Sequence, residues 1–160
     1  MAEIAILRRV REAQQRAPIR QASARWTSYE KTSLMLGRAL FGGYFLYNGI
    51  NHFRNQRMLS GYGASKGVPF PDTAVLGSGA MLVLGGLSLL TGIRPKIGAS
   101  LIGAFLLGVT PKMHDFWRVE DAQQRMGEQV NFFKNIGLLG GALIAAAMPH
   151  PWPASIPTRR

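Results

Sequence analysis

One lysine lies inside a stretch of sequence that is otherwise apolar. Lys134 is the third residue of the segment 132–148, whose length and composition are typical of a membrane-spanning helix. A lysine at the centre of such a helix costs roughly 2.5–3.5 kcal/mol, and the penalty falls toward the interface, where the side chain can reach water. Lys134 is therefore predicted to face protein or an anionic partner, which makes it the first candidate for a binding site.

Two earlier apolar stretches also carry polar residues at helical spacing near one end. These residues are Tyr44, Asn48, Asn51, His52, Thr110 and His114. Antiparallel helices would bring both ends to the depth of Lys134 and its neighbour Asn135. We therefore predict one polar cluster that binds a substrate or a quinone, formed by Asn48, His52, His114, Lys134 and Asn135. The simpler alternative is that these side chains bond to one another and to water.

A cluster of imidazoles with an ammonium group suits three tasks. It can bind a small anion, such as an oxidised sulfur species, it can donate hydrogen bonds to the carbonyl oxygens of a quinone, or it can relay protons. A haem between His52 and His114, or a metal bound by these histidines and Asp115, is a weaker alternative, because nothing else marks such a site. The chain has no cysteine, so iron–sulfur clusters and redox dithiols are excluded. No intrinsic cofactor or metal is expected, and a quinone is the one cofactor that the cluster suggests.

The elements that must position this cluster are four apolar stretches. They cover residues 33–51, 73–93, 97–113 and 130–148, and each has about the ~20 residues needed to cross a bilayer. The predicted fold is all-α, an integral membrane four-helix bundle. The short segment 92–96 makes the second and third helices pack antiparallel, and the polar segment 53–72, rich in glycine and proline, is expected to be an outer loop.

Two smaller expectations concern residues inside the stretches. Small residues recur every four positions on the fourth helix (Gly137, Gly141 and Ala145) and on the third (Ala99 and Gly103), which predicts tight helix packing there. Arg38, inside the first stretch, is expected to extend to lipid phosphate and has no predicted catalytic role.

The charge distribution predicts the orientation in the membrane. The net charge is +11, but seven of the 19 basic residues lie in the first 31 positions without any stacking-aromatic motif, so no nucleic-acid partner is expected. Four crossings place both termini on one side, together with eleven basic residues against six on the other. The positive-inside rule then puts both termini in the cytoplasm. The expected location is the cell inner (plasma) membrane, as a multi-pass protein.

Three parts of the chain follow from this organisation. Residues 1–32 form a basic cytoplasmic arm, for which a surface amphipathic helix is one interpretation. Residues 33–148 form the four-span bundle, and residues 149–160 form a proline-rich C-terminal tail.

Five short motifs resemble the DoxX family of small four-helix membrane proteins, in order and spacing, over residues 33–148. The motifs are GINHF (49–53), YGASKGVP (62–69), GGLSLLTG (85–92), TPKMHDFW (110–117) and FKNIGLLGG (133–141). The resemblance implies a link either to thiosulfate:quinone oxidoreduction or to membrane-bound oxidoreductase complexes with a soluble detoxifying partner. It carries the family's histidine and Lys-Asn motifs onto His52, His114, Lys134 and Asn135.

The resulting hypothesis is a membrane subunit of an oxidoreductase system that holds a quinone or a small anionic substrate near the outer face. The alternative is a non-catalytic accessory or structural subunit of a larger respiratory or photosynthetic membrane complex. A small transporter or lipid-handling protein ranks third, because no inverted repeat is visible. The expected partners are the lipid bilayer and other membrane or membrane-associated subunits. Whether the chain is itself an enzyme stays open at this stage.

Overall fold

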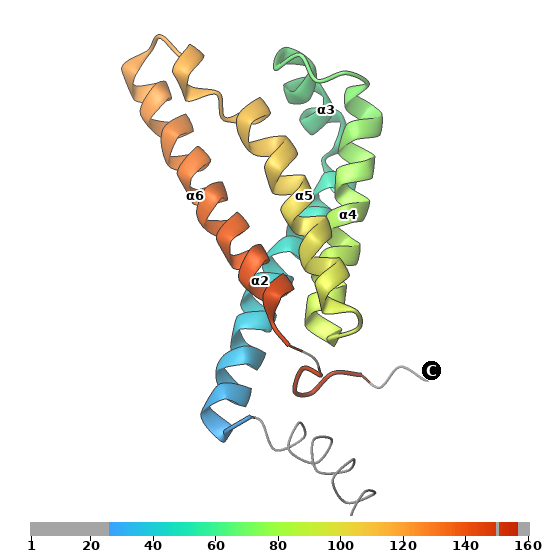
Figure 1. Cartoon of the computed structure of the whole chain (residues 1–160). Helices are drawn as coiled ribbons and strands as arrows, with labels where there is room; N and C mark the ends of the chain where they lie inside the picture. Colours follow the sequence, from blue (N-terminus) through green and yellow to red (C-terminus); the bar gives the residue numbers. More distant parts are fainter. Residues whose placement is uncertain (1–25, 150, 157–160) are drawn as a thin grey trace, which may run out of the picture. The chain divides into compact units, whose positions relative to one another are not determined.

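The computed structural model describes residues 26–149 and 151–156, and these residues form helices and no strand. The helices are α2 (Ser28–Arg54), α3 (Gln56–Ser65), α4 (Pro71–Thr91), α5 (Pro95–Met113) and α6 (Ala122–Ala147), with the 3-10 turn η1 (Phe116–Arg118) before α6 (Figure 1). Each predicted apolar stretch lies in α2, α4, α5 or α6 and extends past its helix by two residues at most. The all-α prediction is confirmed for this part of the chain.

The chain divides into two compact units, Met1–Met35 and Leu36–Arg160. Of the first unit, the structure describes the start of α2. There the backbone N–H of Thr27 donates to Glu30 Oε2 (2.6 Å), and the N–H of Glu30 donates to Thr27 Oγ1 (3.2 Å), a reciprocal capping box. The interpretation of the basic arm as a surface helix falls mainly on residues 1–25, outside the described residues. All other elements below belong to the second unit.

The helix ends follow from local sequence. Pro71 and Pro95 begin α4 and α5, where the missing proline N–H removes no helical hydrogen bond. Gly92, with a φ of 71°, ends α4 in the left-handed conformation that favours glycine. Asp121 caps α6 by accepting the N–H of Gln124 at 2.7 Å.

The prediction of a loop at residues 53–72 is wrong, because α3 occupies residues 56–65. Gly63, one of the glycines of this segment, is buried inside α3, where a Cβ would lie 3.7 Å from both Pro71 and Val68. The chain turns only afterwards, at Gly67 (φ 66°) and Phe70 (φ 48°). A glycine inside a helix leaves the same sequence signal as a glycine in a turn.

The closest backbone approaches join α2 to α4. A Cβ at Gly86 would lie 2.6 Å from the carbonyl oxygen of Gly42, and a Cβ at Gly49 would lie 2.7 Å from the nitrogen of Val83. Gly98 and Gly85 bring α5 against α4 in the same way, since a Cβ at Gly98 would lie 2.9 Å from the Gly85 oxygen. Small residues thus permit close helix packing.

The stripes of small residues expected on the third and fourth helices account for less of the packing. Gly137 has no atom within 4 Å of a Cβ position, and Gly103 has only Leu139 at 3.7 Å. Gly141 does approach the ring of Phe41 on α2, at 3.1 Å, and Ala99 is buried. The prediction is therefore wrong for Gly137 and missed the tighter α2–α4 contact.

The prediction that Arg38 extends to lipid phosphate is wrong. Its side chain is buried and donates hydrogen bonds to the carbonyl oxygens of Leu89, at 2.9 Å, and Leu90, at 2.8 Å, at the end of α4. It also donates to the Pro153 oxygen, and its guanidinium lies 5.7 Å from the centre of the Trp152 ring. The C-terminal segment 151–156 is thereby held at the α4–α5 turn.

Two helices in the described part of the chain, α4 and α6, are long and apolar enough to cross a membrane by length and composition. Only 11% of the most apolar window of α6 is buried, which is unlike the core helix of a soluble protein. Large apolar side chains are also exposed on the other two long helices, including Leu40 on α2 and Leu107 on α5. These surfaces suit contact with acyl chains.

Candidate functional site: a polar pocket between α2, α5 and α6

All five residues predicted as a cluster line one pocket of about 200 Å³. Asn48 and His52 come from the second half of α2, His114 follows the last residue of α5, and Lys134 and Asn135 lie on α6. Three helices distant in sequence therefore bring two imidazoles, an ammonium group and two amides together. The remaining wall is formed mainly by apolar and aromatic side chains, namely Tyr44, Phe45, Leu82, Phe105, Leu106, Val109 and Leu138.

The tautomer of His52 is set by its neighbours on α4. Its Nδ1 lies 3.3 Å from the carbonyl oxygen of Val75 and 3.0 Å from Ser78 Oγ. The carbonyl can only accept, and the Ser78 hydroxyl itself donates to Val75 O at 3.0 Å. Nδ1 must therefore carry the proton. In neutral His52, Nε2 is left as an acceptor, and within the described residues it has no hydrogen-bond partner.

His114 has the same arrangement with a carboxylate in place of the carbonyl. Its Nδ1 lies 2.7 Å from Glu128 Oε2, and the two side chains are only 20% and 14% exposed. Because a carboxylate accepts, Nδ1–H donates, and Nε2 again lacks a partner among the described residues. The hydrogen bond from Nδ1–H to this carboxylate fixes the orientation and the tautomer of the ring.

Lys134 lies at the edge of the pocket. Its Nζ donates to Asn131 Oδ1, one helical turn earlier, at 2.8 Å, and the residue as a whole is exposed. Its neighbour Asn135 is buried at 8% exposure. An exposed residue in a pocket wall marks an opening, so the ammonium group is placed where a ligand would enter.

Not every polar residue at the helix ends joins the pocket. Asn51 accepts a hydrogen bond from Asn55 at 2.6 Å, and Thr110 is buried, yet neither lines the pocket. Asn48 is half-buried and donates to the carbonyl oxygen of Tyr44 at 2.7 Å. Its amide oxygen is the part that remains for a ligand.

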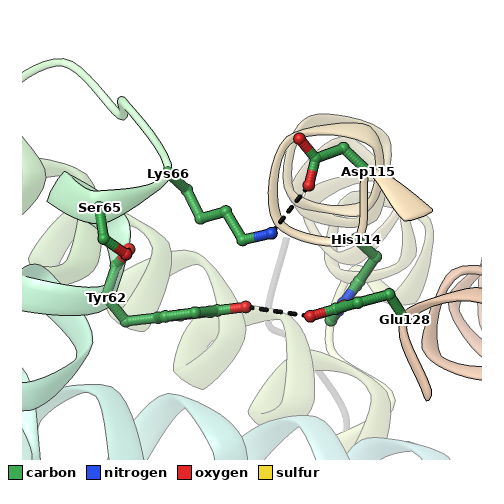
Figure 2. Close-up of polar contacts among 6 residues, drawn as sticks. All are labelled: Tyr62, Ser65, Lys66, His114, Asp115 and Glu128. Carbon is green, nitrogen blue, oxygen red and sulfur yellow. Dashed lines mark hydrogen bonds and ion pairs between the residues drawn. The ribbon is translucent and has the colours of Figure 1, made fainter. Parts of the chain in front are cut away.

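A second layer of polar contacts lies beyond His114 and connects α3 with the start of α6. Figure 2 shows Lys66 donating to Asp115 Oδ1, at 2.8 Å, and the Tyr62 hydroxyl donating to Glu128 Oε1, at 3.4 Å. Glu128 therefore accepts from both Tyr62 and His114. Tyr62 and Glu128 are not among the residues predicted from the sequence, although Glu128, Asn131 and Asn135 share one helical face at spacings of three and four.

Charges in this layer are mutually stabilised. The hydrogen bond from Lys66 lowers the pKa of Asp115, and the hydrogen bond to Asp115 raises the pKa of Lys66. Burial, followed by the negative charge of Glu128, raises the pKa of the Tyr62 phenol. At neutral pH the phenol thus stays a donor to Glu128.

The alternative of a metal bound by two histidines and Asp115 is not supported, because Asp115 is paired with Lys66. Over residues 26–149 and 151–156, no three histidine, aspartate or glutamate side chains are grouped as metal ligands.

Comparison with known protein families identifies a match to part of the chain. The family model named DoxX matches residues 33–115, which are 83 of the 160 residues and run from α2 to just past α5. The match does not extend over α6, which carries Lys134 and Asn135. No curated protein and no solved structure matches the chain.

Proposed function

The chain belongs to the DoxX family, a family of membrane proteins, and we propose that it is the membrane subunit of an oxidoreductase system that binds a quinone headgroup. The observation that carries the proposal is the pocket of about 200 Å³. Its lining combines His52, His114 and Lys134 with apolar side chains. Electrons would come from a partner redox protein, since the chain has no cysteine and no intrinsic redox centre is expected.

The proposal includes four membrane crossings, by α2, α4, α5 and α6, with both termini in the cytoplasm. The charges within α2 and α5 are compatible with this topology. Arg38 of α2 is buried against carbonyl oxygens, and Lys96 and Lys112 lie near the two ends of α5, where their side chains can reach lipid headgroups. Both helices also expose large apolar residues, such as Leu40 and Leu107.

Lys134 and the two histidines each have a role toward a quinone. Lys134 donates a hydrogen bond to one carbonyl oxygen of the ring. An imidazole whose Nδ1 proton is already engaged, as in His52 and His114, exchanges a proton through Nε2 alone. When a partner reduces the quinone, a protonated Nε2 gives its proton to the carbonyl oxygen, and Glu128 holds the His114 ring in place through Nδ1.

The chemistry of the wall favours a quinone over a small anion. Phe45, Leu82 and Phe105 supply flat or apolar surface on which an aromatic ring can lie. A small anion would need several donors and would gain nothing from these side chains. Moreover, Glu128 lies directly behind His114 and would oppose a second negative charge nearby.

The experiment is quinone binding by the purified full-length protein in lipid nanodiscs, measured for wild type, Lys134→Met and Lys96→Met. The control removes the same charge from an exposed lysine at the opposite end of α5. We expect Lys134→Met to weaken binding about tenfold or more, as the loss of a charged hydrogen bond implies, and Lys96→Met to leave it unchanged.

Equal binding by all three proteins would contradict the role of Lys134. No binding by wild type would favour the alternative, a non-catalytic accessory subunit. Binding of thiosulfate or phosphate in place of a quinone, with the same sensitivity to Lys134→Met, would assign the pocket to a small anion.

A further inference from the structure

A second and larger pocket, of about 560 Å³, lies on the other side of α5. Its walls come from α3, from the first half of α4 and from the second half of α5, for example Leu59, Ala74, Met81 and Gly108. Most of its lining is apolar. Figure 1 shows that α4 and α5 are close together at their short connection and apart at the opposite end, where α4 begins and α5 ends.

The two pockets have part of their lining in common. His52, Phe105, Val109 and His114 line both the polar pocket and the larger apolar one. The Phe105 ring stands at 70° to the His52 ring, with 5.9 Å between the ring centres. A ligand that contacts these residues from the polar side is therefore next to the apolar pocket.

We propose, on the basis of the proposed function, that the apolar pocket takes the prenyl tail of the quinone whose ring occupies the polar pocket. The substrate class is then a prenylated, lipid-soluble quinone and not a water-soluble quinone or anion. An apolar chain next to a ring with two polar oxygens matches one apolar pocket joined to one polar pocket.

Two glycines keep the apolar pocket open. A Cβ at Gly77 of α4 or at Gly108 of α5 would meet no atom within 4 Å, and both residues are exposed while lining the pocket. The pocket is thus open between α4 and α5, on a surface that also exposes Leu76 and Leu107. A tail can enter there from the bilayer without passing through water.

The same glycines provide the test. Gly108→Leu and Gly77→Leu place a branched side chain in the tail pocket from two different helices. Gly137→Leu is the matched control, because Gly137 is equally open and exposed but lines neither pocket. Each protein, in nanodiscs, is titrated with a benzoquinone that carries a long prenyl tail and with the same ring without a tail.

Affinities are compared as the ratio of variant to wild type, since partition of each quinone into the bilayer is common to all the proteins. We expect Gly108→Leu and Gly77→Leu to weaken binding of the tailed quinone about tenfold or more and to leave binding of the tail-less ring unchanged. Gly137→Leu should change neither. Retained binding of the tail-less ring also shows that the variants are folded.

Three results overturn the inference. If wild type binds the tail-less ring and the pocket variants bind the tailed quinone as wild type does, the tail lies elsewhere, while the proposed function stands. If the pocket variants weaken both quinones equally, the apolar pocket is not a separate tail site. If wild type binds neither quinone, the inference and the proposed function fail together.

Discussion

The Nδ1 of His114, just past the end of α5, lies 2.7 Å from Glu128 Oε2 on α6. This hydrogen bond joins the end of α5 to α6 beside the pocket. Glu128 also accepts from Tyr62 on α3, so one carboxylate connects three elements (Figure 2). It fixes a ring of the proposed site without itself lining the pocket.

The His114–Glu128 contact should show measurable coupling in a double-mutant cycle. We expect His114→Ala, Glu128→Ala and the double variant to give a coupling energy of about 0.5–3 kcal/mol, because the two side chains are mostly buried and directly bonded. Thermal unfolding in detergent measures it. The same cycle with His114 and the exposed Glu120, which has no hydrogen bond or ion pair among the described residues, should give a value near zero. Coupling of equal size in both cycles would contradict the contact.

The Lys66–Asp115 ion pair predicts stability that depends on pH. The pKa of Asp115 lies below its ordinary value of 3.8. Its contribution to the free energy of unfolding is therefore complete above pH 3.8 and is lost as the pH falls through the lowered pKa. The pKa of Lys66 lies above its ordinary value of 10.5. Its contribution to the free energy of unfolding is therefore complete below pH 10.5 and is lost as the pH rises through the raised pKa. The pair therefore stabilises the protein between these limits.

Asp115→Asn should lower the free energy of unfolding by about 1 kcal/mol within that window, the upper range for a pair near the surface. The difference from wild type should disappear in strong acid, where Asp115 is protonated. Unfolding midpoints across the pH range measure this, with Glu120→Gln as a control for the same loss of charge. A difference that persists unchanged in acid would show that the substitution acts by another route.

Arg38 should be a large contributor to stability. Arg38→Met removes the donor for three carbonyl oxygens and the cation over Trp152. We expect a loss of about 3 kcal/mol or more, because charged donors contribute about 1.5–3 kcal/mol each and the buried carbonyls are left unpaired. Residues 151–156 should also become susceptible to limited proteolysis.

The matched control is Arg94→Met, at an exposed arginine in the α4–α5 turn. It should leave both the unfolding midpoint and the cleavage pattern as in wild type. If Arg38→Met behaves in the same way, the hydrogen bonds to Leu89, Leu90 and Pro153 do not hold the C-terminal segment.

Helical periodicity was sufficient to bring the five cluster residues together. Asn48 and His52 are four residues apart and so share a face of α2, and the antiparallel order of the helices sets His114 and Lys134 at a similar height. Neither step depends on the details of side-chain packing. Spacing therefore predicted that these five side chains lie together, but it also placed Asn51 and Thr110 with them, and neither lines the pocket.

The partners of Arg38 and His114 could not be predicted in this way. Arg38 bonds to Pro153, 115 residues later, and His114 bonds to Glu128, which precedes the apolar stretch and resembles an ordinary loop charge. Such contacts depend on how a tail or a helix start folds against a distant element. The larger pocket was also missed, because it is bounded by α3, whose glycines and polar residues are typical of a loop.

The close approach of α2 and α4 predicts that Gly86 tolerates a larger side chain far less well than Gly137 does. Gly86→Ala should lower the thermal midpoint and the yield of folded protein, since the new Cβ would lie 2.6 Å from the Gly42 oxygen, a backbone atom that cannot move alone. Gly137→Ala, also in a helix but with open space around it, should leave the midpoint unchanged or raise it slightly. Equal effects at both positions would show that the two helices separate readily.

The absence of cysteine makes the topology directly testable, because any single introduced cysteine is the only thiol in the protein. The contacts of Asp115 with Lys66 and of Glu128 with Tyr62 place Glu120 at the α3 end of the second unit, whereas Lys96 lies at the opposite end of α5, near the segment 151–156. With both termini in the cytoplasm, Glu120→Cys should react with a membrane-impermeant maleimide in intact cells. Lys96→Cys should react only after permeabilisation. Labelling of both positions in intact cells would contradict the four-crossing proposal, and the reverse pattern would invert the orientation and move the polar pocket to the cytoplasmic side.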